Sequence, residues 1–290
     1  MLALASCAAP AVPAHDILFR GMCDASGAWV SPRGELWVAD DESSEIRVFS
    51  MDGGGPVRTV DLGLGEGEAD LEGAAEQSGV VYWIASHGRN KDAEPRPARQ
   101  VLVAMAPDGT GVARFPGLLP ALLASPDVGP VLRTAEPRAP KKGGIAIEGL
   151  AAAGDRLWIG FRSPLDANGN ALVVSVELAA GGPVVGEARH LDLGGRGVRS
   201  LEYAGGSWWI VAGGAGPTGS AGLYQWDGAA SPVPVPADLA DLNPEALVRL
   251  PDGRLAILSD DGTRPVGGGE CKSAPVAERS FRGRILKPPG

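Results

Sequence analysis

The chain has 290 residues, enough for one large domain or two smaller ones. Hydrophobic residues make up 44% of it, which supports a folded core and excludes a disordered chain. Its 43 glycines and 25 prolines are typical of many short strands joined by tight turns. The net charge of −9 argues against nucleic-acid binding, because phosphate contacts need clustered Lys and Arg. An acidic chain instead suits the capture of cations.

Residues 1–18 are expected to form a leader and a tether. Their apolar stretch ends in Leu4-Ala5-Ser6-Cys7, which resembles a bacterial lipobox, and an Ala/Pro-rich segment follows. In this interpretation Cys7 carries a lipid, and that lipid is the protein's only attachment to a membrane. We therefore expect a bacterial cell-envelope lipoprotein, or else a periplasmic or secreted protein. A chance match is the alternative, because only six residues precede Cys7.

A sequence pattern recurs along the rest of the chain, beginning at Met22, Leu71, Ile147, Val198 and Pro244. Each copy has a polar residue, a short apolar strand, a Gly-containing turn and a second strand that usually contains Trp, and a further strand pair follows. A period of about 50 residues with four strands in each copy is typical of a β-propeller. We predict an all-β fold in which residues 19–290 form a single, monomeric β-propeller of four-stranded antiparallel sheets. Five blades are expected, and six are the alternative.

The interval between the second and third copies contains extra sequence, at about residues 112–144. Within it, residues 118–125 are expected to form a short helix. The extra segment is either an insertion or lid on the propeller, or a degenerate sixth blade.

Two further cysteines, Cys23 and Cys271, lie near opposite ends of the predicted propeller. In an oxidising compartment they could form one bridge that closes a very long loop. Two unpaired thiols are equally compatible with the sequence, because sequence alone does not show that two residues are close in space.

Charged residues recur where the inner strands of the repeats begin and end. In a propeller the innermost strand of each blade lines the central channel, and ligands usually bind where its loops open. The residues at the heads of the inner strands are Asp24, Glu72, Glu148, Arg199 and Glu245. The residues just beyond the second strands are Asp41, His87, Arg162, Gly213 and Asp260. Because hairpin partners run in opposite directions, both sets are expected at one mouth of the channel.

Several segments resemble an uncharacterised bacterial family, a domain of unknown function expected to be a propeller. They are FRGMCDAS, ADLEGAA, YWIASHGRNKD, IEGLA, WIGFRSPL and NPEAL, and the resemblance extends from Phe19 onward. Its most specific block is SHGRNKD, residues 86–92. The EGLA segments are more distantly similar to esterase-like phytase and to calcium-dependent gluconolactonase and phosphotriesterase propellers, in which a Glu in this setting can hold a metal. The uncharacterised family implies a fold and a functional face, but no established activity.

Carboxylates that converge on one mouth repel one another, which raises their pKa values or requires a cation. The predicted metal ligands are Asp24, Glu72, Glu148 and Glu245, and such oxygen donors suit Ca²⁺, with Mg²⁺ as the alternative. Candidate contacts to a small or anionic ligand are Asp41, Arg89, Asn90, Lys91, Arg199, Asp260 and Arg264. The candidate catalytic residues are His87, Glu148 and Arg162, with His87 moving protons. The structural alternative is a ring of salt bridges between Arg199 and the Glu residues that holds the blades together.

Two classes of function remain. The first is a binding propeller whose acidic mouth holds a cation and a small ligand, and the second is a metal-dependent hydrolase of phosphate or carboxylic esters at the same site. The chain contains no G-x-S-x-G, H-E-x-x-H, C-x-x-C or P-loop motif, so serine-triad, zinc-protease, redox and nucleotide chemistries have no support. Its seven tryptophans are expected to pack between blades.

Overall fold

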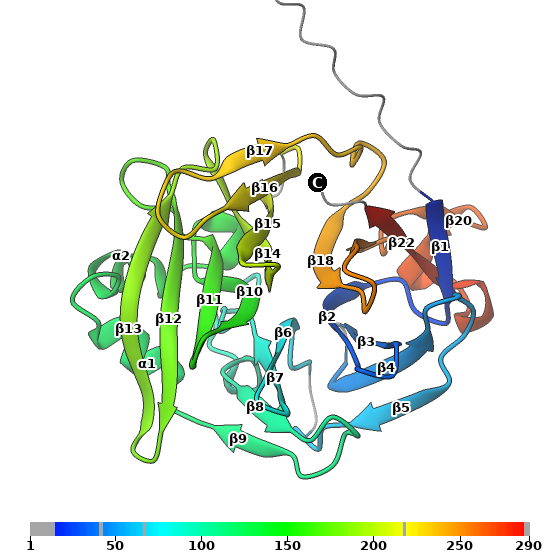
Figure 1. The fold of residues 1–290 in the computed structure, drawn as a ribbon, viewed down its shortest axis with the longest axis horizontal. Helices are drawn as coiled ribbons and strands as arrows, with labels where there is room; N and C mark the ends of the chain where they lie inside the picture. Colours follow the sequence, from blue (N-terminus) through cyan, green and yellow to red (C-terminus); the bar gives the residue numbers. More distant parts are fainter. Residues whose placement is uncertain (1–14, 41–42, 66–67, 217–218, 287–290) are drawn as a thin grey trace, which may run out of the picture.

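Five four-stranded antiparallel sheets surround a central axis as the blades of a β-propeller (Figure 1). The structure is a computed structural model, and it describes residues 15–40, 43–65, 68–216 and 219–286. The predicted fold and the number of blades are confirmed. Residues 1–14 of the expected leader and tether (1–18), including Cys7, lie outside the described residues. Residues 15–18 belong instead to the first strand, which begins at His15, ahead of the expected boundary at Phe19.

Each of the first four blades is built from consecutive strands, which run in order from the channel outward. Blade 1 contains β2 (Ala25–Val30), β3 (Glu35–Asp40), β4 (Glu45–Ser50) and β5 (Arg58–Asp61). Blade 2 contains β6 (Leu71–Gln77), β7 (Val80–Ala85), β8 (Leu102–Met105) and β9 (Ala113–Phe115). Blade 3 contains β10 (Ala146–Ala153), β11 (Arg156–Ser163), β12 (Ala171–Ala179) and β13 (Gly182–Leu191). Blade 4 contains β14 (Arg196–Ala204), β15 (Ser207–Gly214), β16 (Gly222–Trp226) and β17 (Val233–Val235).

Blade 5 joins the two ends of the chain and closes the ring. From the channel outward it contains β18 (Pro244–Arg249), β19 (Leu255–Ser259), β22 (Ser280–Leu286) and β1 (His15–Arg20). The β1–β22 pair buries a stacked contact between Phe19 and Phe281, with ring centroids 4.9 Å apart. A disulfide between Cys23 and Cys271 adds a covalent link next to this seam, with a Cα–Cα distance of 6.0 Å. Of the two possibilities left open by the sequence, the bridge is the one found.

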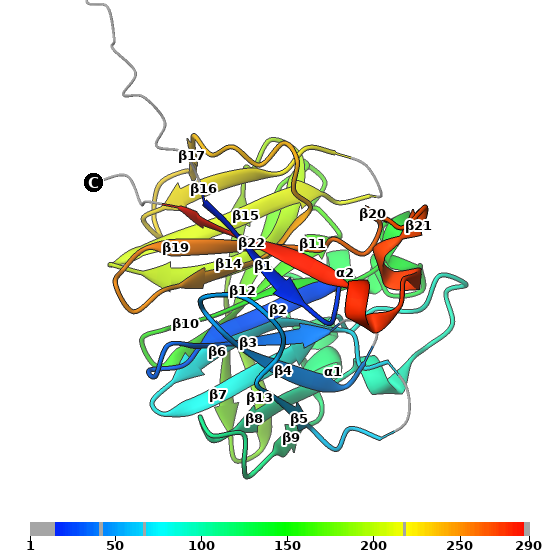
Figure 2. The ribbon, with the colours of Figure 1, turned by 90° about the vertical axis from the view of Figure 1, so that its right-hand side faces the viewer.

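The insertion folds into two short helices, α1 (Leu118–Ala124) and α2 (Gly129–Ala135). Leu122 and Leu132 of these helices are completely buried against residues of blades 2 and 3, among them Phe161. The segment is therefore a packed part of the junction between two blades and forms no sixth blade. It lies on the same face of the ring as the small hairpin of β20 (Pro265–Val266) and β21 (Gly269–Glu270), at the right in Figure 2. Among the described residues, neither helix is long and apolar enough to cross a membrane.

Apolar side chains fill the junctions between neighbouring blades as five separate clusters. Trp37 and Trp83 are completely buried in the junction between blades 1 and 2. Trp208 and Trp226 pack in the junction between blades 3 and 4. The tryptophans therefore stabilise the contacts between blades, as the sequence predicted.

The inner strands of neighbouring blades approach one another so closely that only small residues fit between them. A Cβ atom added at Gly27 would lie 2.7 Å from the backbone nitrogen of Gly73 in the next blade. One added at Gly73 would lie 2.9 Å from Leu150, and one at Gly149 would lie 2.9 Å from Val198. Distances below 3.0 Å are essentially never seen for real Cβ atoms, so these glycines set the width of the ring.

We expect Gly27→Ala to lower the free energy of unfolding by about 2 kcal/mol, because the new methyl group meets rigid backbone and forces two blades apart. Urea denaturation followed by tryptophan fluorescence measures this loss. Gly181→Ala is the matched control, since a Cβ atom there meets nothing within 4 Å. Equal stability of the two variants would contradict the steric role of Gly27.

Candidate functional site

Each inner strand carries a β-bulge near its head, and the bulged residue lies at one mouth of the central channel. In β6, Leu71 pairs with Ala85 and Gly73 pairs with Ile84, so that Glu72 is the extra residue of the bulge. The same irregularity isolates Glu148 in β10, Arg199 in β14 and Glu245 in β18. A bulge re-aims the side chain of the extra residue, and bulges of this kind often lie beside functional sites.

Glu148 is the centre of an ion-pair network at this mouth. The side chain is almost completely buried, and each of its carboxylate oxygens accepts from a different guanidinium. Arg162 donates to Oε1 at 2.8 Å, and Arg199 donates to Oε2 at 3.2 Å. Arg199 also lies 2.5 Å from Glu245 Oε1, so that one chain of charges connects blades 3, 4 and 5.

Backbone and amide oxygens accept further hydrogen bonds from the two arginines. Arg162 donates from Nε to the carbonyl of Gly214 and from Nη2 to the carbonyl of Gly216. Arg199 donates from Nη2 to Asn243 Oδ1 at 3.2 Å, and the amide of Asn243 in turn donates to Asp260 at 3.0 Å. Both guanidiniums are thus held in place by the protein itself.

The mouth contains more negative than positive charge. The carboxylates of Glu72, Glu148, Glu245 and Asp260 all attract Arg199, and Arg162 is the second cation of this group. Burial raises the pKa of Glu245 well above its usual value, with repulsion by Glu148 and Asp260 in the same direction and Arg199 opposing. Burial also raises the pKa of Asp260, although the backbone N–H of Gly262 donates to it. For Arg199, burial disfavours the charge, but attraction by Glu245 and Glu148 outweighs it and raises the pKa.

This arrangement of ion pairs bears on the predicted calcium site. Within the described residues, no three or more His, Cys, Asp or Glu side chains are grouped as metal ligands. Glu148 already binds two guanidiniums, whereas Ca²⁺ prefers 6–8 oxygen ligands. The four predicted ligands form no ready-made calcium site in this arrangement, and calcium binding at the mouth stays a prediction.

The strand pairing shows that Asp24 does not occupy in blade 1 the position that Glu72 occupies in blade 2, contrary to the prediction from the sequence. In blade 1 the bulge covers Ser26 and Gly27, so Ser26 is the counterpart of Glu72, while Asp24 precedes the strand. The carboxylate of Asp24 lies instead beside Gly262, whose added Cβ would be 1.8 Å from Oδ1. The sequence alignment was wrong here because it matched acidic residues and overlooked the shared Gly.

His87 is likewise one position away from its predicted place. Leu71 pairs with Ala85 and Ile147 pairs with Phe161, so the counterpart of Arg162 is Ser86. His87 is buried, and its Nδ1 lies 2.8 Å from the carbonyl oxygen of Ala85, to which it donates. Burial lowers its pKa to about 4, which keeps the ring neutral at pH 7. Its catalytic role stays a prediction.

The SHGRNKD segment mainly connects blade 2 to the insertion. Arg89 donates to the backbone carbonyl and to the carboxylate of Glu136, both at 2.7 Å, at the end of α2. Asn90 accepts from the backbone N–H of Glu94 at 2.8 Å and closes a tight turn, and Lys91 is exposed. These contacts stabilise the loop, so ligand binding by the three residues stays a prediction.

Arg264, another predicted ligand contact, lies outside the ion-pair network of Glu148, Arg162 and Arg199. Arg264 donates to the carbonyl oxygen and the hydroxyl of Ser280 in blade 5, at 3.0 Å and 2.7 Å. Asp41 lies outside the described residues.

A buried polar cluster near the mouth was missed by the sequence analysis. Asp70 accepts from the hydroxyl of Ser86 and pairs with Arg99 at 3.1 Å. Burial raises the pKa of Asp70, against the opposing effects of Arg99 and Ser86. The sequence repeat already pointed to Asp70, because this residue occupies in blade 2 the position that Asp24 occupies in blade 1.

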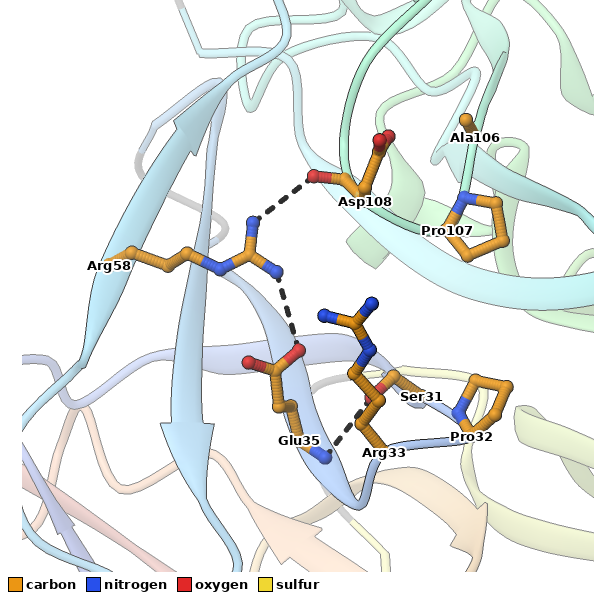
Figure 3. A pocket seen from close by; sticks show the side chains of 8 residues that line it. All are labelled: Ser31, Pro32, Arg33, Glu35, Arg58, Ala106, Pro107 and Asp108. Carbon is orange, nitrogen blue, oxygen red and sulfur yellow. Dashed lines mark hydrogen bonds and ion pairs between the residues drawn. The ribbon is translucent and has the colours of Figure 1, made fainter.

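Two hollows lie on the opposite face of the ring among the described residues, and no predicted site residue lines either of them. One is an open cavity of about 460 Å³ between the β2–β3 and β8–β9 turns (Figure 3). Arg58, which lines this cavity, donates hydrogen bonds to the carboxylate of Glu35 at 3.3 Å and to the backbone carbonyl of Asp108 at 3.1 Å. The other is a cavity of about 210 Å³ at the far end of the central channel.

The similarity to solved structures supports the propeller fold and carries no information about function. Glutaminyl cyclase from Myxococcus xanthus is similar with a TM-score of 0.50 and 14% identity, over 95% of this chain and 96% of that chain. A luciferin-regenerating enzyme has a TM-score of 0.48 and 8% identity, over 95% and 96%. A putative gluconolactonase has a TM-score of 0.47 and 13% identity, over 92% and 76%.

No curated protein matches the chain. Residues 114–255 match the family described as "Protein of unknown function (DUF3616)", from blade 2 through the insertion to blade 5. The resemblance to an uncharacterised propeller family, expected from the sequence motifs, is thereby confirmed over these residues.

Proposed function

We propose that this protein is a binding propeller and that the acidic mouth of its channel holds a small cation as, or together with, its ligand. The observation that carries the proposal is the excess of carboxylates there. Four carboxylates surround two guanidiniums, and burial raises the pKa of two of those carboxylates, Glu245 and Asp260. A cation that entered the mouth would relieve this repulsion and would favour the ionised forms.

Capture of an anion by the arginines has less support. The donors of Arg162 are directed at Glu148 and at two backbone carbonyls, and Arg199 is bound to Glu148, Glu245 and Asn243. An incoming anion would have to break these contacts and would meet the carboxylates beside them. The arginines therefore act as fixed counter-charges that hold Glu148 and Glu245 in place.

We also propose that the protein acts outside the cytoplasm. Its disulfide is typical of oxidising compartments, and the lipobox-like residues at Cys7 support attachment to the cell envelope. A lipid on Cys7 would place the propeller next to a membrane without a membrane-spanning segment.

The first prediction concerns the cation. Saturating CaCl₂ or putrescine should raise the melting temperature by roughly 5 °C relative to chelator-treated protein, as mass action predicts for a ligand at about 100 times its Kd. Glu245→Gln should remove most of this shift, because it deletes a carboxylate of the mouth. Glu270→Gln, an exposed carboxylate on β21, is the control and should keep the shift. Identical melts with both cations and with chelator would overturn the proposal, whereas a response to only one of them would identify the kind of cation.

Glu148→Gln should lower the free energy of unfolding by about 3 kcal/mol, because it leaves two partly buried guanidiniums without their shared counter-charge. The exposed pair of Glu187 and Arg189 on β13 offers a matched control, and Glu187→Gln should change stability by less than about 0.5 kcal/mol. Urea denaturation of both variants measures the difference. An unchanged or raised stability of Glu148→Gln would show that the network is strained rather than stabilising.

The lipid anchor is tested by expressing the gene in a bacterial host with a radioactive fatty acid. The wild-type protein should carry the label and fractionate with membranes, and Cys7→Ser should lose both properties. Label that persists in Cys7→Ser, or its absence from the wild type, would count against the anchor.

A further inference from the structure

The larger hollow, on the face of the ring opposite the acidic mouth, brings two arginine side chains to one open space (Figure 3). Its volume of about 460 Å³ lies within the usual range of small-molecule sites. Arg58 lines it from β5, and Arg33 lines it from the β2–β3 turn. Figure 3 shows the guanidinium of Arg33 pointing into this space, between Arg58 and Pro107. Two positive charges therefore face one cavity.

Arg58 is held in place by the protein itself. Its guanidinium lies 4.3 Å from the ring centroid of Trp37, which is completely buried. The carboxylate of Glu35 accepts a hydrogen bond from Nη2, and the backbone carbonyl of Asp108 accepts one from Nη1. A guanidinium has further N–H groups beyond those used in these bonds, and they can serve a ligand. Arg58 is therefore a fixed donor at the wall of the cavity.

The guanidinium of Arg33 lacks such partners. Within the described part of the chain it forms no ion pair and no hydrogen bond, and the side chain is exposed. The carboxylates of the cavity are engaged elsewhere. Glu35 pairs with Arg58 at 3.3 Å, and Asp108 accepts from the hydroxyl of Thr110 at 2.7 Å. The cavity thus contains one guanidinium whose charge none of its own carboxylates neutralises.

The turn that carries Arg33 has two counterparts in the propeller. All three turns contain a Pro, then a variable residue, then a Gly with positive φ, and they close with the same backbone hydrogen bonds. They are residues 31–35, 106–110 and 250–254. In two of them the variable residue is an aspartate, which caps the turn. Asp108 accepts from the backbone N–H two residues further on at 3.0 Å, and Asp252 does the same at 3.0 Å.

Arg33 stands at the variable position of its own turn and cannot accept this hydrogen bond. The hydroxyl of Ser31 takes over the role and accepts from the backbone N–H of Glu35 at 3.1 Å. The arginine therefore contributes nothing to the turn that the aspartates contribute to theirs. Residues that depart from a local structural preference in this way are expected at functional sites.

Apolar side chains form the rest of the wall. They are Pro32, Ala106 and Pro107. A carboxylate attached to an apolar body can contact this wall and both guanidiniums at once, whereas an inorganic ion can use only the guanidiniums. One free guanidinium beside the pair of Arg58 and Glu35 also suits a single negative charge better than a doubly charged phosphate. We propose that this cavity is a binding site for a small organic carboxylate, which Arg33 and Arg58 hold together.

The test uses benzoate, which carries one carboxylate on an apolar ring, with benzamide as its neutral analogue and inorganic phosphate as the other kind of anion. Isothermal titration calorimetry of the full chain at pH 7 gives the dissociation constants, and two-dimensional NMR follows the backbone amide of Gly34 in the turn. Arg33→Gln removes the free charge. Arg33→Asp introduces the residue type of the other two turns and should therefore keep the fold intact. Arg138→Gln, at an exposed arginine of the insertion, is the matched control.

Benzoate should bind saturably and shift the Gly34 signal, and benzamide and phosphate should bind at least about tenfold more weakly. Arg33→Gln and Arg33→Asp should each weaken benzoate binding about tenfold or more, as expected for the loss of a hydrogen bond between charged groups. Arg138→Gln should match the wild type. The proposal is overturned if benzoate does not bind, if benzamide or phosphate binds as tightly as benzoate, or if the Arg33 variants keep the wild-type affinity. The cation site at the mouth is tested separately through Glu245, so neither result decides the other.

Discussion

The close approach of the five inner strands is the constraint on which the rest of this structure depends. In a narrow ring the strands that line the channel touch their neighbours through backbone, and Gly27, Gly73 and Gly149 allow that contact. The corresponding residues in the other two blades are Ser200 and Ala246, which are also small. Ser200 uses the proximity to accept from the backbone N–H of Leu247 in the next blade at 2.9 Å. Larger residues at these positions would open the ring.

The same constraint explains why charges collect at one mouth. A bulge next to each small residue turns the preceding side chain out of the ladder, where it can avoid the crowded contact between strands. Glu72, Glu148, Arg199 and Glu245 are therefore neighbours because of the way the ring is built. Because the carboxylates are neighbours, they need counter-charges, and Arg162 and Arg199 neutralise only part of the negative charge at the mouth. The far end of the channel differs, because alanines of three inner strands line it together with Glu76, Glu202 and Arg249.

Much of the fold could be predicted from the sequence because the repeat occurs in all five blades. The positions of Glu148, Arg162, Arg199 and Glu245 followed from the same repeat, and the structure brings these side chains together. Blade 1 was misaligned because Ser26 replaces the acidic residue at its bulge, and acidic Asp24 lies nearby. Glu202 was missed for another reason. It lies within a strand, and only the three-dimensional ring shows that it lines one hollow with Glu76, Arg249 and alanines of other blades.

The bridge between Cys23 and Cys271 changes the topology of the molecule. The chain between them, which includes blades 1 to 4 and the inner half of blade 5, becomes a covalently closed loop. A protease that cuts one exposed turn inside this loop opens it without releasing a fragment. The blades on either side of the cut stay joined through the sulfur atoms and through the strands that pack around the channel. Surface damage is therefore confined to a local opening, and the two ends of the chain that build the closing blade stay tied to the rest.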